Sequence, residues 1–174
     1  VLDNLMVGRM GTEQMSGVAI ANQLIFVFNL LIFGGLSGAG IFGAQFSGRR
    51  DEDGLRHVMR FKLYFVVITS IIGIVILSVW GAPLIRLFLH EGSEEGDLVK
   101  TLNFGLDYLK IMLIGLPMYA VSQCYASSLK ETGETFIPMI GSGTAVLVNL
   151  VFNYILIFGK FGFPVMGVKG AAIA

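Results

Sequence analysis

Charged side chains are scarce in this 174-residue sequence, making up 14% of it, against about 25% in an ordinary soluble domain. The deficit is concentrated, because no Asp, Glu, Lys, Arg or His occurs in 14–48, 63–85, 111–129 or 135–159. Each stretch reaches roughly the 20 residues that a helix needs to cross about 30 Å of hydrocarbon. The composition therefore excludes a soluble domain and indicates a membrane protein.

Cysteine and histidine are nearly absent as well. The single cysteine, Cys124, excludes an internal disulfide and a cysteine-based zinc site. Both histidines, His57 and His90, flank polar loops. Twelve basic residues balance twelve acidic ones, so bulk charge suggests neither nucleic acid nor an anionic membrane surface as a partner. We expect no metal site and no cofactor.

The charge-free stretches predict an all-α, polytopic transmembrane bundle that forms a single transmembrane domain over 1–174. The two ends of the chain are apolar and look like parts of further helices, so we expect a fragment of a longer protein, cut inside one span at each end. The predicted spans are 1–8 (partial), 15–46, 57–80, 98–129, 136–158 and 167–174 (partial).

Basic residues predict the orientation in the membrane. Five of the twelve lie in or beside the 46–62 loop, namely Arg49, Arg50, Arg56, Arg60 and Lys62. Loops with such dense clusters tend to be cytoplasmic. Alternation of the spans then divides the basic residues six to six between the two sides, so the density of the cluster, rather than the total, decides the prediction.

Two short motifs resemble enzyme signatures, but their context argues against both. Residues 38–43 (GAGIFG) match the spacing of a dinucleotide-binding loop, yet they lie inside a charge-free helix with no preceding strand. Residues 35–38 (GLSG) resemble an intramembrane serine protease motif, but no span supplies a histidine as the base. We therefore predict that the protein is not an enzyme and has no catalytic residues. Small residues four apart in this region instead favour close helix packing.

Polar side chains inside the apolar stretches are candidate cavity residues. Asn22 and Asn29 are seven apart on one predicted helix, and Asn149 and Asn153 are four apart on another, so each pair shares a helix face. Polar groups at membrane depth face the bundle interior or a water-filled cavity. Hydrogen bonds between helices and a polar substrate cavity both fit this pattern.

Three further positions stand out. Asp3 is a carboxylate within an apolar segment, where burial favours the neutral form and makes a functional role the default hypothesis; a boundary residue with a partner elsewhere is the alternative. Pro117, inside the fourth span, marks a helix kink that is either static or a point of movement. Asp107 and Lys110 are three apart and are predicted to pair on one helix face.

The order of several segments resembles the multidrug and toxic compound extrusion (MATE) transporters. The resemblance covers the whole chain, and its strength lies in the succession of segments, because no single one is specific. The segments are 3–11 (DNLMVGRMG), 33–40 (FGGLSGAG) with Ala44, Gln45 and Gly48, 108–111 (YLKI) with 115–117 (GLP), 149–159 (NLVFNYILIFG) and 167–172 (GVKGAA).

The resemblance implies a multi-pass protein of the cell (inner) membrane that exports amphipathic, often cationic, organic compounds by cation-coupled antiport and alternating access. Such transporters have two lobes of six helices, so this chain would be most of the first lobe and its partner the missing C-terminal lobe. Asp3 matches the aspartate proposed to be protonated in proton-coupled members, and Asn149 matches an asparagine near it. Asn153 falls where those members often have a second aspartate, and because asparagine cannot titrate, this departure argues against coupling by paired carboxylates and leaves Asp3 as the only candidate acid. The resemblance implies H⁺ as the coupling ion, with Na⁺ as the alternative.

Two other functions remain open at this stage. A lipid-linked oligosaccharide flippase of the same superfamily would share the span count, but it would favour basic residues at membrane depth, and the charge-free stretches contain none. A non-transport scaffold or passive channel would leave Asp3 without a role.

Overall fold

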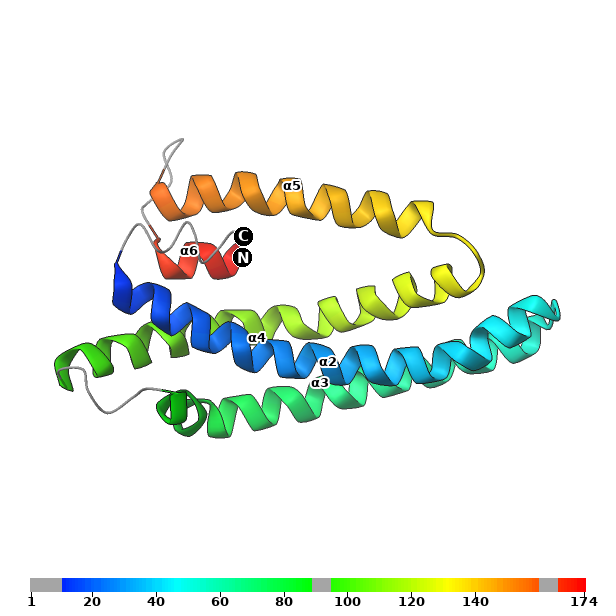
Figure 1. Ribbon diagram of the computed structural model, residues 1–174, viewed down its shortest axis with the longest axis horizontal. Coiled ribbons are helices and arrows are strands. Elements are labelled where there is room, and N and C mark those ends of the chain that lie inside the picture. Colours follow the sequence, from blue (N-terminus) through cyan, green and yellow to red (C-terminus); the bar gives the residue numbers. More distant parts are fainter. Residues whose placement is uncertain (1–10, 89–94, 160–165) are drawn as a thin grey trace. The chain divides into compact units, whose positions relative to one another are not determined.

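The computed structural model describes residues 11–88, 95–159 and 166–174, and every regular element in these ranges is a helix (Figure 1). The all-α fold class predicted from the sequence is confirmed. Asp3 lies outside the described residues. The helices are α2 (Thr12–Gly48), α3 (Glu52–Phe88), α4 (Glu95–Glu131), α5 (Phe136–Phe158) and α6 (Val168–Ile173).

Four of these helices contain segments long and apolar enough to cross a membrane: Thr12–Gly48, Glu52–Phe88, Leu98–Glu131 and Phe136–Phe158. The helices α2, α3 and α4 each have 37 residues. At 1.5 Å per residue this corresponds to about 55 Å, whereas the hydrocarbon layer is about 30 Å thick. These helices must therefore tilt or project beyond the hydrocarbon, and their terminal turns lie near its edge.

Helix α3 is longer than the predicted span 57–80. It begins at Glu52 because Asp51 caps it: Asp51 Oδ1 accepts a hydrogen bond of 3.0 Å from the Gly54 amide. It also continues through Pro83 to Phe88. Ile85 is fully buried in these last turns. Its packing against the neighbouring helix stabilises the turns after Pro83, where a proline by itself would tend to end the helix.

The described chain divides into two compact units, and the long helices each contribute a segment to both. Unit 1 comprises Val1–Phe26, Ile76–Ile114 and Ala145–Ala174. Unit 2 comprises Val27–Val75 and Gly115–Thr144. In α4 the boundary falls three residues before Pro117, and the helix continues through that proline without interruption.

Unit 1 is centred on a close backbone approach between α2 and α4. A Cβ atom added at Gly17 would lie 2.6 Å from the Thr101 carbonyl oxygen and 2.9 Å from the Gly105 amide nitrogen. The fully buried side chains of Val18 and Tyr108 pack in the same unit. Glycine is thus required at position 17 because no side chain fits between the two helices.

Unit 2 is held together by phenylalanine rings that rest on glycines of the opposite helix. Helices α2 and α3 run antiparallel and side by side in this unit (Figure 1). The rings of Phe28 and Phe46 in α2 contact Gly73 and Gly54 in α3, and the ring of Phe65 in α3 contacts Gly35 in α2; we call these three pairs the ring seats. A glycine surface without a Cβ lets each ring approach the opposite backbone.

The predicted cytoplasmic side of the 46–62 loop can be tested by cysteine labelling. In a Cys124→Ala background, Gly48→Cys should resist a membrane-impermeant maleimide in intact cells, whereas Gly92→Cys should react. Gly48 is a better position than Gly54 because it is exposed and open, while a side chain at Gly54 would meet a phenylalanine ring. Both cysteines should label in permeabilised cells. Labelling of Gly48→Cys together with protection of Gly92→Cys in intact cells would reverse the orientation.

Candidate functional site

In unit 1, the predicted asparagines on α2 and α5 take part in hydrogen bonds between side chains. Asn22 Oδ1 accepts a hydrogen bond of 3.1 Å from the hydroxyl of Tyr108, which is fully buried. Asn153 is also buried, and its Nδ2 donates to Asn149 Oδ1 over 3.0 Å. Position 153 thus carries a neutral amide that interacts along its own helix.

Asp107 forms a different ion pair from the one predicted. Its Oδ2 lies 3.2 Å from the Lys169 ammonium of α6, so the predicted pairing with Lys110 on the same helix is wrong. Both partners are about half exposed, which makes this pair a weak contributor to stability. Its effect is to connect α6 to α4 within unit 1.

Unit 2 contains a cavity of about 430 Å³ between α2 and α4, which we call the α2–α4 cavity. Asn29 lines this cavity, and its Oδ1 atom is buried with no hydrogen-bond partner among the described residues. A buried acceptor without a partner costs about 1–3 kcal/mol. The lining comprises Asn29, Ile32, Phe33, Leu36, Ser37, Gly40, Ala44, Tyr119, Gln123, Ser127, Lys130 and Glu131.

This lining is chemically mixed in a way that suits amphipathic molecules. Phe33 and Ile32 provide apolar surface, and Tyr119 adds an aromatic ring with a hydroxyl. Asn29 and Gln123 provide amide groups that can donate and accept hydrogen bonds. Apolar walls with a few polar groups are typical of small-molecule sites, and the volume falls within their usual range of about 300–1,000 Å³.

A buried ion pair lies at one end of the cavity. Lys62 of α3 is fully buried, and its ammonium contacts the Oε1 atom of Glu131 in α4. Ser127 completes the cluster, because its hydroxyl accepts from Lys62 Nζ over 3.3 Å and donates to Glu131 Oε1 over 2.8 Å. We call these three residues the Lys–Glu–Ser cluster. Sequence analysis missed it, although Lys62 directly precedes the charge-free stretch 63–85 and Glu131 follows 111–129 by two residues.

Helix α2 accommodates the carboxylate of this cluster with two glycines, which we call the glycine notch. A Cβ atom at Gly40 would lie 2.6 Å from Glu131 Oε1, and one at Gly43 would overlap with Oε2. Gly34 and Gly38, also expected at a packing face, have open space around them in the described part of the chain. Of these four glycines, only Gly40 and Gly43 therefore meet the Glu131 carboxylate.

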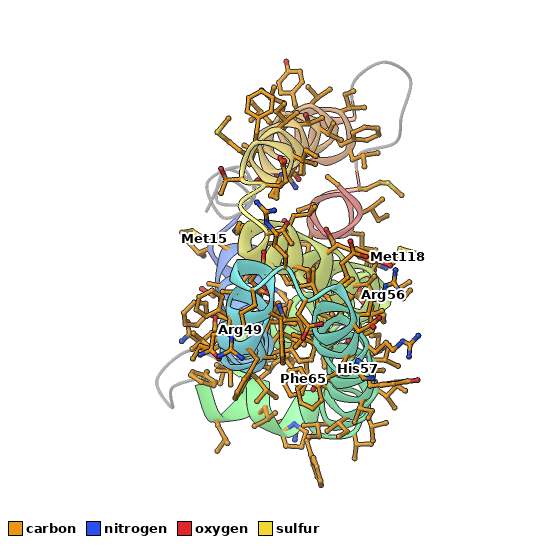
Figure 2. The ribbon with its side chains drawn as sticks, turned by 90° about the vertical axis from the view of Figure 1, so that its right-hand side faces the viewer. Met15, Arg49, Arg56, His57, Phe65 and Met118 are labelled. Atoms are coloured by element: carbon orange, nitrogen blue, oxygen red, sulfur yellow. The ribbon has the colours of Figure 1, made fainter. Side chains whose placement is uncertain are left out.

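The charged side chains in the first turns of α3, before the cluster, are exposed. Arg56 forms ion pairs with Glu52 and Asp53 over 3.7 Å and 3.5 Å, and His57 Nδ1 lies 2.7 Å from the Asp53 carbonyl oxygen. Figure 2 shows the side chains of Arg56 and His57 on the outer surface of α3. In the described ranges, no three His, Cys, Asp or Glu side chains come together to bind a metal ion.

Long apolar helices with polar groups along the cavity between them define a polytopic membrane protein. Comparison with known sequences places the chain more specifically. The MatE family profile matches residues 1–155, and the chain therefore belongs to the MatE family. The resemblance to MATE transporters seen in the sequence is thus confirmed, and the family's members are transporters rather than enzymes.

Individual relatives match nearly the whole chain. It is 30% identical over 99% of its length to the probable multidrug resistance protein NorM of Thermotoga maritima, and 32% identical over 99% to that of Halalkalibacterium halodurans. It is 28% identical over 99% to the multidrug resistance protein PmpM of Pseudomonas aeruginosa. The chain spans about 36% of the length of the first two relatives and 35% of the third. No solved structure matches it significantly.

Proposed function

We propose that this chain forms most of the first lobe of a secondary active transporter that exports amphipathic organic cations in exchange for a coupling cation. The observation that carries the proposal is similarity over 99% of the chain to relatives named as multidrug resistance proteins. The mixed aromatic, apolar and amide lining of the α2–α4 cavity supports a substrate that is itself amphipathic. A second lobe of the same protein would complete the transport path.

The proposed coupling ion is the proton, and Asp3 is the proposed carrier in this lobe. A carboxyl group in an apolar bundle is costly when ionised and inexpensive when neutral, so its protonation state can be tied to the side of the membrane that it faces. Asn153 cannot titrate, which leaves Asp3 without a second aspartate at that position. A sodium site elsewhere in the protein is the alternative source of coupling.

Transport in proteoliposomes tests this proposal directly. Vesicles that contain the complete protein should move ethidium against its gradient when a pH gradient is imposed, and the movement should stop when a protonophore collapses that gradient. A sodium gradient alone should drive no transport. Equilibration at the same rate without any gradient would indicate a passive channel, and dependence on sodium alone would overturn the assignment of the proton.

A further inference from the structure

The full burial of Lys62 requires an explanation beyond packing. Lysine is almost never fully buried unless it is paired, because removal of its charge from water is expensive. The Coulomb attraction in a buried ion pair often does no more than offset this penalty, and apolar residues of similar volume commonly serve stability as well. Stability alone therefore gives little reason to place an ammonium group at this position.

The carboxylate of the same pair is accessible from a second direction. Glu131 lines the α2–α4 cavity together with Ser127, whereas Lys62 does not line it. The side chain of Glu131 retains 12% of its exposure, while that of Lys62 has none. Glu131 thus lies between a buried ammonium on one side and a cavity large enough for a small molecule on the other.

The surroundings of Glu131 suit a bulky cation in that cavity. Phe33 and Tyr119 line the same space and offer aromatic faces, which attract organic cations. The glycine notch leaves α2 without side chains at the carboxylate, so this helix provides it with no competing partner. An anion in the cavity would instead be repelled by the negative charge of the Glu131 carboxylate.

We propose that Lys62 is a tethered counter-cation, and that an organic cation entering the α2–α4 cavity binds Glu131 by displacing the Lys62 ammonium. This inference rests on the proposed function, since it assigns a binding group for the exported cation. With the cavity empty, Lys62 neutralises a carboxylate that would otherwise be buried without a partner. With the cation bound, Lys62 keeps its hydrogen bond to the Ser127 hydroxyl. After the cation leaves, Lys62 again neutralises Glu131, so the empty transporter can close and return at no large electrostatic cost.

Other charged groups near the cluster are exposed and affect cation binding in the α2–α4 cavity only weakly. Lys130 of α4 lines the α2–α4 cavity, and Arg56 of α3 borders a neighbouring cavity that also reaches Glu131. Both are exposed, so water screens their charges. The thiol of Cys124 lies within electrostatic range of Lys62 and Glu131. The α2 segment that faces the cluster carries no charged residue between 27 and 48.

Binding of tetraphenylphosphonium to the complete protein in nanodiscs, measured by calorimetry without any gradient, tests the inference. Lys62→Met should tighten binding, because the apparent affinity of a site is reduced by the fraction of time for which it is blocked. If Glu131 is free of Lys62 in about one molecule in ten, the gain is about tenfold. Glu131→Gln added to Lys62→Met should remove the gain. Triphenylphosphine oxide, a neutral analogue, should bind with equal affinity to the unaltered protein and to Lys62→Met.

Two comparisons separate this role from a structural one. Lys110→Met removes an exposed lysine in unit 1 and should leave the affinity unchanged. Lys62→Gln keeps a hydrogen-bond donor near Glu131 without the charge, so it should fold if Lys62→Met does not and should still tighten binding. Unchanged or weaker tetraphenylphosphonium binding in the folded Lys62 variants would overturn the inference. Because no gradient is used, that result would leave the proposal of coupled export standing, and a failure of coupled export would not alter these affinities.

Discussion

Replacement of Asp3 by asparagine is expected to abolish export driven by a pH gradient while leaving synthesis and membrane insertion intact. Asparagine preserves the size and most of the polarity of the side chain but cannot exchange a proton. Removal of a buried ionisable group also seldom harms folding, because the charge itself is what burial penalises. The measurement is the initial rate of ethidium export in proteoliposomes under an imposed pH gradient, with protein content matched by immunoblot.

Asn153→Asp is the informative companion to this variant. It introduces a second carboxyl group at a buried position, where the amide now donates to Asn149. Two carboxyl groups titrate differently from one, so the pH dependence of export should shift while transport persists. Normal export by Asp3→Asn under a proton gradient would show that Asp3 is not the proton carrier, and the second lobe would become the place to look.

Gly17→Ala is expected to destabilise unit 1 strongly for so small a change. The added methyl group would lie 2.6 Å from the Thr101 carbonyl oxygen, which belongs to the backbone of α4 and cannot rotate away. The helices must therefore move apart, at a cost of about 1–3 kcal/mol. The thermal midpoint of the purified protein should fall, and its yield after size-exclusion chromatography should drop.

Gly34→Ala provides the matched control on the same helix. A Cβ atom at Gly34 meets nothing within 4 Å in the described part of the chain, so only helix propensity changes. Alanine is favoured over glycine in a helix by about 1 kcal/mol, and the thermal midpoint should stay constant or rise. Equal losses in the two variants would show that the contact at Gly17 is not what limits stability.

The helices could be predicted from the sequence because their signal is local. A stretch without charge such as 63–85 is incompatible with water and sufficient for a span, whatever surrounds it. The ends were less predictable, because they depend on single contacts. Asp51 begins α3 earlier than its apolar pattern suggests, and the buried Ile85 helps carry the helix past Pro83.

The Lys–Glu–Ser cluster could not be predicted because its charged partners are 69 residues apart. Their contact depends on how α3 and α4 are rotated about their own axes, and weakly amphipathic membrane helices carry little information on rotation. The wrong pairing of Asp107 with Lys110 has the same origin. A rule for neighbours on one helix was applied where a lysine from another helix, Lys169, is the actual partner.

The ring seats favour one alignment of α2 and α3. Two rings project from α2 and one from α3, and each meets a residue without a side chain on the other helix. A slide of one helical turn, about 5.4 Å, would move all three rings off the glycines that they contact. The three contacts tie α2 and α3 together over the length of unit 2, so we expect this part of the two helices to move as one rigid body if the lobe changes conformation.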